Sequence, residues 1–280
     1  MTPEHSATID LHVHTTASDG AVTPADVVAA ALDLGLKAIA ITDHDSVEGV
    51  DQALAAAAGT ALQVLPGVEL SARAANASDV HVLGYLIDHH DPTLLAALKR
   101  LREERLRRAV AMVRALADAG HGIELDAVLR HAAAGAVGRV HVARALVEAG
   151  SVDSIEQAFA DLIGRDRPFY VRKAFFSSEE ALALIHGAGG VGVLAHPGVT
   201  GESALVSLVD AGLDGIEAYH AEHTAPQQAH FASLAARFGL LVTGGSDYHG
   251  PGMRSAALGT GECPAGALEA LRVRATILRP

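Results

Sequence analysis

Short apolar segments alternate with longer amphipathic stretches along the first ninety residues of the chain. Each apolar segment has the length and the Val, Ile, Leu and Ala content of a buried strand, and they span residues 8–12, 37–42, 61–70 and 79–85. A helix begins between the first two, because Thr23 can cap it, Pro24 suits its first position and Asp26 favours its first turn. Strands that alternate with helices predict a mostly parallel sheet, and enough of them close into a barrel.

A long helical region interrupts this alternation near residue 92. Residues 91–119 carry apolar side chains at helical spacing. Three more helical segments are expected near residues 125–134, 140–149 and 154–162. We therefore predict an α/β barrel built from residues 8–91 and 174–280, with residues 92–173 as a helical insertion.

The alternation of strands and helices returns in the last third of the chain. Helices are expected over residues 178–187, 204–211 and 226–238. Strands are expected over residues 191–195, 215–218 and 240–243. The tail from Pro264 predicts one short helix followed by a last strand at residues 275–278.

The composition narrows the class of protein. Half of the residues are hydrophobic but only 4% are aromatic, so the interior must consist mainly of Ala, Val and Leu. The net charge of −12 argues against a broadly basic surface that wraps nucleic acid, but it leaves room for a local phosphate pocket. A single cysteine, Cys263, rules out a disulfide framework. With no signal peptide and no apolar stretch that could span a bilayer, the sequence predicts a soluble, cytoplasmic protein without membrane association or an evident obligate protein partner.

Histidine and carboxylate side chains gather at the ends of the expected strands. His12 and His14 are two residues apart on a strand, so they point to the same side. Asp19 lies in the loop after this strand, His81 lies within a later strand, and the remaining candidates end or follow later strands: His44, Glu69, His196, Asp247 and His249. In a parallel barrel these strand ends converge on one site. Imidazole and carboxylate together suit zinc, manganese or iron, and nine ligands with Glu69 as a bridge suit two or three metal ions.

The motifs resemble those of the PHP (polymerase and histidinol phosphatase) family. They are His12-x-His14, Ser18-Asp19-Gly20, Thr42-Asp43-His44-Asp45, Gly67-Val68-Glu69, His81, Leu194-Ala195-His196-Pro197 and Ser246-Asp247-x-His249. The resemblance implies a distorted (β/α)7, TIM-like barrel with three divalent metal ions, manganese first and iron or zinc as alternatives. It assigns His12, His14, Glu69 and Asp247 to one metal, Asp19, His44 and His249 to a second, and Glu69, His81 and His196 to a third.

The helical insertion is similar to that of the branch that hydrolyses nucleoside bisphosphates or trims RNA from its 5′ end. This implies a metal-dependent phosphoesterase acting on phosphomonoesters of small nucleotides, or on short RNA ends, by attack of a metal-bound hydroxide, with the insertion as a substrate lid. His196, Asp247 and a metal-bound water are the candidates for the catalytic proton donor. The alternatives are a histidinol-phosphate phosphatase and a non-catalytic PHP structural module.

Five residues are candidates for substrate binding. Arg105 and Arg108 share a helix face and could grip one phosphate, or they could form a solvated face paired with nearby glutamates. Arg139 and His141 could likewise contact substrate, although an Arg that opens a helix is common without a function. Asp45 could contact substrate or cap a helix that begins near Ser46.

Overall fold

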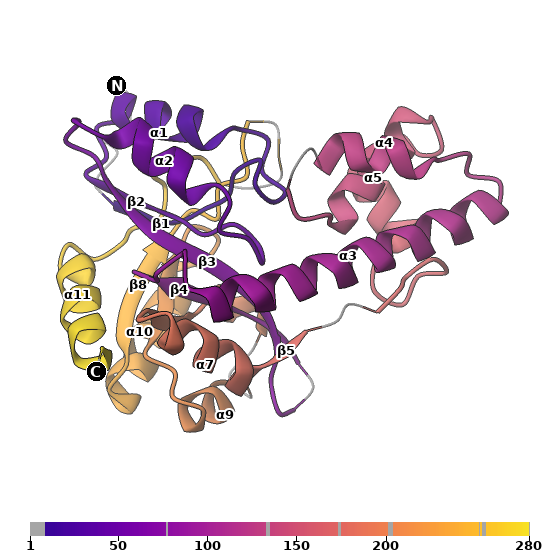
Figure 1. Ribbon diagram of the computed structural model, residues 1–280. Coiled ribbons are helices and arrows are strands. Elements are labelled where there is room, and N and C mark those ends of the chain that lie inside the picture. Colours follow the sequence, from indigo (N-terminus) through magenta and orange to yellow (C-terminus); the bar gives the residue numbers. More distant parts are fainter. Residues whose placement is uncertain are drawn as a thin grey trace. The chain divides into compact units, whose positions relative to one another are not determined.

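The apolar segments form a single eight-stranded sheet in the computed structural model (Figure 1). The structure describes residues 9–279 apart from 77, 133–134, 173–174, 201–203, 252 and 254–255, so Thr8, Lys173, Ala174 and Pro280 at the expected boundaries lie outside the described residues. The strands run in the order β1-β2-β3-β4-β6-β7-β8, with β5 beside β3. Their bounds are Ile9–Val13 (β1), Ala38–Ile41 (β2), Gln63–Arg73 (β3), Asp79–Tyr85 (β4), Phe176–Ser177 (β5), Val191–Leu194 (β6), Gly215–His220 (β7) and Leu241–Gly245 (β8).

Strand β4 runs against its neighbours, whereas the other pairings in the sheet are parallel. It pairs antiparallel with β3 on one side and with β6 on the other. The chain between Arg73 and Asp79 is too short for the helical crossover that a parallel pair requires, so β4 must fold back as a hairpin. The strand pairings that do not involve β4 are parallel, as expected.

The two ends of the sheet meet where β1 lies beside the segment that follows β8. The backbone N–H of His14 donates to the carbonyl of Tyr248 at 2.8 Å. A side chain at Gly245 would place its Cβ 2.4 Å from the Cβ of His12, so only glycine permits this approach. The seven strands other than β5 thus form a nearly closed, TIM-like α/β barrel.

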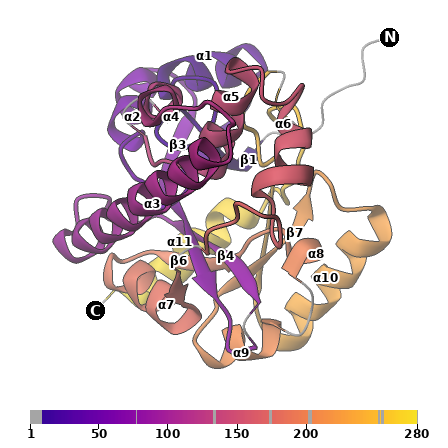
Figure 2. The same cartoon turned by 90° about the vertical axis from the view of Figure 1, so that its right-hand side faces the viewer.

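Helices of the same unit lie alongside the strands (Figures 1 and 2). Helix α2 lies beside β3, α7 beside β3 and β4, α10 beside β7 and α11 beside β8. The bounds are Pro24–Asp33 (α1), Val50–Ala57 (α2), Ser178–Gly187 (α7), Pro197–Thr200 (α8), Leu205–Asp210 (α9), Ala225–Phe238 (α10) and Ala267–Leu278 (α11). Thr23 caps α1 as expected, its hydroxyl accepting from the N–H of Asp26.

The last helix corrects the expectation of a strand at residues 275–278. Helix α11 continues without a break to Leu278. Ala267, Leu271 and Ala275 are spaced four residues apart and are buried against the barrel core with Leu11 and Val193. This helical spacing of core contacts outweighs the local preference of Thr276 and Ile277 for a strand.

The chain divides into two compact units, Met1–Ala96 with Phe175–Pro280, and Ala97–Ala174. The second unit is helical, and its described residues contain no strand. Its elements are the greater part of α3 (Pro92–Asp118), α4 (Leu125–Ala132), α5 (Arg139–Glu148), α6 (Ile155–Gln157) and the π-helical turn η1 (Ala158–Ile163). It has its own core, in which Met112, Leu116, Val128, Leu146 and Ile163 are buried. In the described part of both units, every helix is too short or too polar to cross a membrane.

Candidate metal centre

Glu69 lies at the centre of the histidine and carboxylate cluster. It stands on β3 with its side chain buried, and histidine ring nitrogens from four other segments surround its two oxygens. The distances are 2.7 Å to His44 Nδ1, 2.7 Å to His81 Nδ1, 3.1 Å to His196 Nε2, 3.2 Å to His14 Nε2 and 3.5 Å to His12 Nε2. The ends of several strands therefore converge on one carboxylate.

Asp247, just after β8, completes the side of the cluster nearest β1. One carboxylate oxygen, Oδ1, is 3.0 Å from His14 Nε2 and 3.3 Å from His12 Nε2. Asp247 and His196 both have positive φ, 54° and 29°, which is costly for residues other than glycine. Backbone strain of this kind is concentrated at functional sites, and here it occurs at two strand ends that carry candidate ligands.

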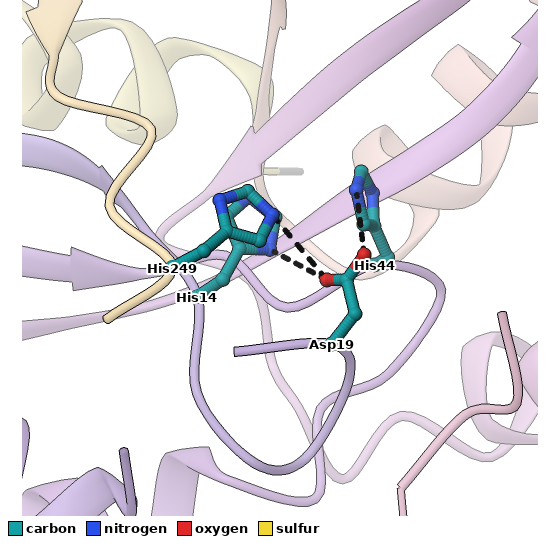
Figure 3. Close-up of side chains that lie close together, drawn as sticks. All are labelled: His14, Asp19, His44 and His249. Atoms are coloured by element: carbon teal, nitrogen blue, oxygen red, sulfur yellow. Dashed lines mark ion pairs between the residues drawn. The ribbon is translucent and has the colours of Figure 1, made fainter. Parts of the chain in front are cut away.

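A second group surrounds Asp19 and comprises His14, Asp19, His44 and His249 (Figure 3). The nearest ligand atoms of the four residues lie within 4.8 Å of one another. The Asp19 carboxylate is 3.4 Å from His249 Nε2 and 4.0 Å from a ring nitrogen of His14 and of His44. The rings of His14 and His249 stack with centroids 4.1 Å apart.

Buried aspartates hold the loops that carry these ligands. Asp43 accepts hydrogen bonds from the N–H and hydroxyl of Thr15 and from the hydroxyl of Ser18, which anchors the loop bearing Asp19. Asp10 accepts from the N–H and hydroxyl of Ser246, immediately before Asp247. The sequence argument assigned no role to either aspartate, although Asp43 stands beside His44 in the same motif.

The cluster strongly perturbs the pKa values of its members. Burial by itself raises the pKa of Glu69, but the surrounding imidazoles, His44 foremost, hold it well below its usual range. Burial lowers the pKa of His44 to about 4 in spite of the nearby carboxylates. For His14 burial also acts downward, but hydrogen bonds to Asp247 and Glu69 outweigh it and raise the pKa to about 10. Buried carboxylates held ionised among imidazoles form a cation-binding environment.

The residues present fit divalent metal ions. Among the described residues, several buried atoms of the cluster lack a hydrogen bond of good geometry: Nε2 of His12, both ring nitrogens of His14, Nδ1 of His44 and Oε2 of Glu69. Buried polar atoms are costly without partners, and a cation among them would satisfy nitrogen and carboxylate lone pairs together. Mixed imidazole and carboxylate sets suit manganese, iron and zinc.

Candidate ligands whose atoms lie close together form groups, and these groups overlap with the sets implied by the family resemblance. His12, His14 and Asp247 lie together, and His14 also joins the group of Asp19. A third group contains His44, Glu69 and His81, with His196 within 3.1 Å of the same glutamate. His14 and His44 each belong to two of these groups, and Glu69 lies close to members of all three.

Two residues on β7 join the cluster although the sequence argument did not assign them to it. Neither Glu217 nor His220 is among the nine candidate ligands taken from the sequence. Both are buried, and with His12 they form a further group of close ligand atoms. The available signal was a charged residue inside the otherwise apolar strand Gly215–His220, where burial without a partner is rare.

The substrate-binding candidates have partners within their own units. Asp45 is buried, and its carboxylate accepts from the N–H and hydroxyl of Ser71 at 2.7 and 2.9 Å. It caps no helix, because α2 begins at Val50 after Gly49. In the second unit, His141 Nδ1 accepts from the N–H of Gly138 and so completes the start of α5.

Two arginines of the insertion, Arg108 and Arg139, lie over one aromatic ring. Arg108 and Arg139 each place a guanidinium 5.5 Å from the ring centre of Tyr170. Arg105 is only 8% exposed, so it does not belong to a solvated helix face. The exposed pair on this helix is instead formed by Arg107 and Glu104.

A nearly closed barrel with buried histidines, aspartates and a central glutamate at its strand ends defines a metal-dependent hydrolase, and the comparisons with known proteins specify the bond it cleaves. The PHP domain family model matches residues 10–161, and the chain belongs to this family. It is a metal-dependent phosphoesterase, a hydrolase of phosphoric ester bonds.

Two relatives that match most of the chain are named for nucleotide or RNA substrates. The chain is 38% identical to a 3′,5′-nucleoside bisphosphate phosphatase of Chromobacterium violaceum, over 88% of each chain. It is 34% identical to the 5′-3′ exoribonuclease Rnm of Escherichia coli, over 86% of this chain and 85% of that one. Among solved structures, a protein from Bifidobacterium adolescentis assigned as a metal-dependent phosphoesterase superposes with a TM-score of 0.88 at 34% identity, over 96% of each chain.

Proposed function

We propose that this phosphoesterase removes a phosphomonoester from small nucleotides of the 3′,5′-bisphosphate class, with the 5′ end of short RNA as a second candidate substrate. The observation that carries the proposal is the convergence of five histidines on Glu69. The similarity to the bisphosphate phosphatase and to the exoribonuclease over most of the chain supports the nucleotide class.

In this proposal three divalent ions, manganese first, are held by the nine residues at the strand ends. These are His12, His14, Asp19, His44, Glu69, His81, His196, Asp247 and His249. When bound, such ions neutralise the phosphoryl oxygens and lower the pKa of a coordinated water. The chain itself orients the rings, excludes bulk water from Glu69 and keeps the carboxylates ionised.

In this proposal the proton for the leaving oxygen comes from a coordinated water or from His196, and His196 can supply it only while the donating nitrogen is not bound to a metal ion. The pKa of Asp247 is held well below its usual range: burial acts in the opposite direction, but His12 and the other nearby imidazoles outweigh it. Asp247 is therefore ionised near neutral pH and is a poor acid. The pKa of His196 is raised, because the hydrogen bond to Glu69 outweighs the effect of burial.

The proposal assigns the remaining phosphate of the substrate to the arginines of the insertion. A substrate with one phosphate needs only the metal centre, whereas a bisphosphate carries a second one that needs its own cationic partner. Arg105, Arg108 and Arg139 supply planar guanidinium groups suited to phosphate oxygens, and two of them are held in place by Tyr170. Asp45 on the barrel unit and His141 on the insertion each stay candidates for substrate contacts in this proposal.

The test is a substrate panel assayed with manganese-loaded protein. Adenosine 3′,5′-bisphosphate, adenosine monophosphate, histidinol phosphate and a 5′-phosphorylated RNA trinucleotide should be compared by kcat/KM. We expect the bisphosphate to be the best substrate, and reaction in ¹⁸O-water to place the label in released phosphate. A preference for histidinol phosphate would favour that alternative, and no turnover of any ester by metal-loaded protein would favour a non-catalytic module.

Metal content provides a second, independent check. Elemental analysis of purified and reloaded protein should find more than one transition metal ion per chain. At most one ion per chain after reloading would contradict the three-metal proposal while leaving the phosphoesterase class untouched.

A further inference from the structure

The end of strand β7 brings two buried polar side chains, Glu217 and His220, to the same cluster. Residues three apart on a regular strand point to opposite faces. The pairing of β7 with β8 shifts register between Glu217 and Tyr219, and this irregularity turns both side chains toward His12. Strand β7 therefore contributes two side chains to the candidate metal centre, although it carries none of the nine expected ligands.

Glu217 uses each carboxylate oxygen for a different candidate ligand. Oε1 is 3.0 Å from His12 Nδ1, and Oε2 accepts from the backbone N–H of His196 at 2.8 Å. An ionised carboxylate can only accept, so His12 carries a proton on Nδ1, and in the neutral ring the Nε2 lone pair faces Glu69 and Asp247. The second bond holds His196 in its left-handed backbone conformation at φ 29°.

His220 has the opposite tautomer, and this argues that it is not a ligand. Its Nδ1 accepts from the backbone N–H of Glu222 at 3.2 Å. A neutral ring with an accepting Nδ1 carries its proton on Nε2. Nε2 is buried and faces Asp247 Oδ2 at 3.8 Å. His220 therefore presents an N–H, not a lone pair, to the Asp247 carboxylate.

We propose that Glu217 and His220 are positioning residues: Glu217 orients the ligands His12 and His196, and His220 orients the ligand Asp247. This rests on the proposed function, in which those three residues hold metal. Carboxylate and imidazole partners of this kind fix ligand tautomers and typically contribute roughly 10–100-fold to metal affinity or activity. The alternative hypothesis is that His12, Glu217 and His220 bind a separate metal ion, because their ligand atoms lie close together.

The test for Glu217 is the substitution Glu217→Gln. An amide offers one acceptor in place of two, so either the His12 bond or the His196 bond is lost. We expect manganese affinity, measured by chelator competition, to fall roughly 10–100-fold. The ¹⁵N signals of the His12 ring or of the His196 amide in metal-free protein should also change. Glu217→Asp, one methylene shorter, is the second variant and carries the same readouts if the Gln protein does not fold.

Asp214→Asn is the matched control. Asp214 is also buried beside β7, and its carboxylate accepts from Gly192 and His186, outside the cluster. We expect lower stability in this variant with unchanged metal affinity and unchanged His12 and His196 signals. The proposal for Glu217 is overturned if Glu217→Gln binds manganese like the wild type with both signals unchanged, or if Asp214→Asn loses affinity equally. If the wild-type protein binds no metal, the proposed function fails. If the wild type binds metal and only the Glu217 outcomes differ from expectation, the positioning role alone fails.

The test for His220 compares Leu and Gln at this position. His220→Leu should bind as many metal ions as the wild type but with lower affinity and lower kcat, because the Asp247 carboxylate no longer faces an N–H. His220→Gln, whose amide can place an N–H near the position of Nε2, should restore part of both. Loss of one full metal equivalent in His220→Leu would make His220 a ligand and overturn its positioning role, as would an unchanged affinity.

Discussion

At the scale of single residues, Glu69 is the position on which the centre depends. We expect Glu69→Gln to fold, because size is kept, but to lose most bound metal and at least 100-fold in kcat, since neither oxygen of an amide carries the bridging charge. Elemental analysis and turnover measure both effects. Glu48→Gln, on an exposed residue, is the control and should leave both unchanged. Near-normal metal content in Glu69→Gln would contradict the bridging role.

His14 makes the stability of the metal-free protein dependent on pH. Its pKa in the fold, about 10, lies above the ordinary value of 6.5. The stabilisation from its charge is therefore fully present below about pH 6.5 and is lost as the pH rises through about 10. We expect metal-free protein to unfold at a lower urea concentration at pH 10 than at pH 7. The difference should be smaller in His14→Gln, and an equal difference in both proteins would contradict the assignment.

At the scale of elements, the contact between β1 and β8 aligns the candidate ligands on β1 with those that follow β8. Gly245→Ala would force a Cβ into the backbone of His12, with N only 2.6 Å away. We expect a loss of about 1–3 kcal/mol in the free energy of unfolding, as overpacking costs, together with weaker metal binding because His12 is displaced. Urea unfolding and chelator competition measure the two quantities.

Gly187→Ala is the control for this prediction. Gly187 ends α7, is exposed and has no atom within 4 Å of an added Cβ. The same chemical change should there be neutral or stabilising by about 0.5–1 kcal/mol, with normal metal affinity. If Gly245→Ala behaved like Gly187→Ala, the close approach of β1 and β8 would not matter for the site.

At the scale of the whole molecule, the barrel unit and the insertion have different predicted tasks. We expect Arg105→Ala and Arg108→Ala each to weaken turnover of bisphosphates or RNA ends by roughly 1–3 kcal/mol, the cost of a lost bond to a charged group. A small artificial monoester such as p-nitrophenyl phosphate should be nearly unaffected. The measurement is kcat/KM for both substrates on both variants, with exposed Arg107→Ala as the control.

The comparison of the two substrates decides what the arginines do. Equal losses on both would mean that Arg105 and Arg108 act through folding or through the metal centre. No loss on either would leave both arginines with a packing role inside the insertion, Arg108 through its contact with Tyr170, and would favour histidinol phosphate as the substrate.

The sequence by itself predicted most of the order of strands and helices in the barrel, and it singled out the histidines and carboxylates that lie together around Glu69. Apolar period and helix caps are local properties, so β2, α7 and β6 lie close to where they were expected. The spacing of His12 and His14 and their place at a strand end are local as well. Because parallel strand ends meet at one edge, this was enough to predict the convergence of histidines that the structure shows around Glu69.

Only the tertiary structure decided what depends on contacts between distant segments. The direction of β4 follows from a short connection and the partners on either side of it. Residues 275–278 are helical because Ala275 packs into the barrel core. Glu217 enters the site through an irregular strand pairing and bonds to residues far away in the sequence. Local patterns specify which residues can bind a metal, whereas long-range packing specifies which buried side chains hold those residues in place.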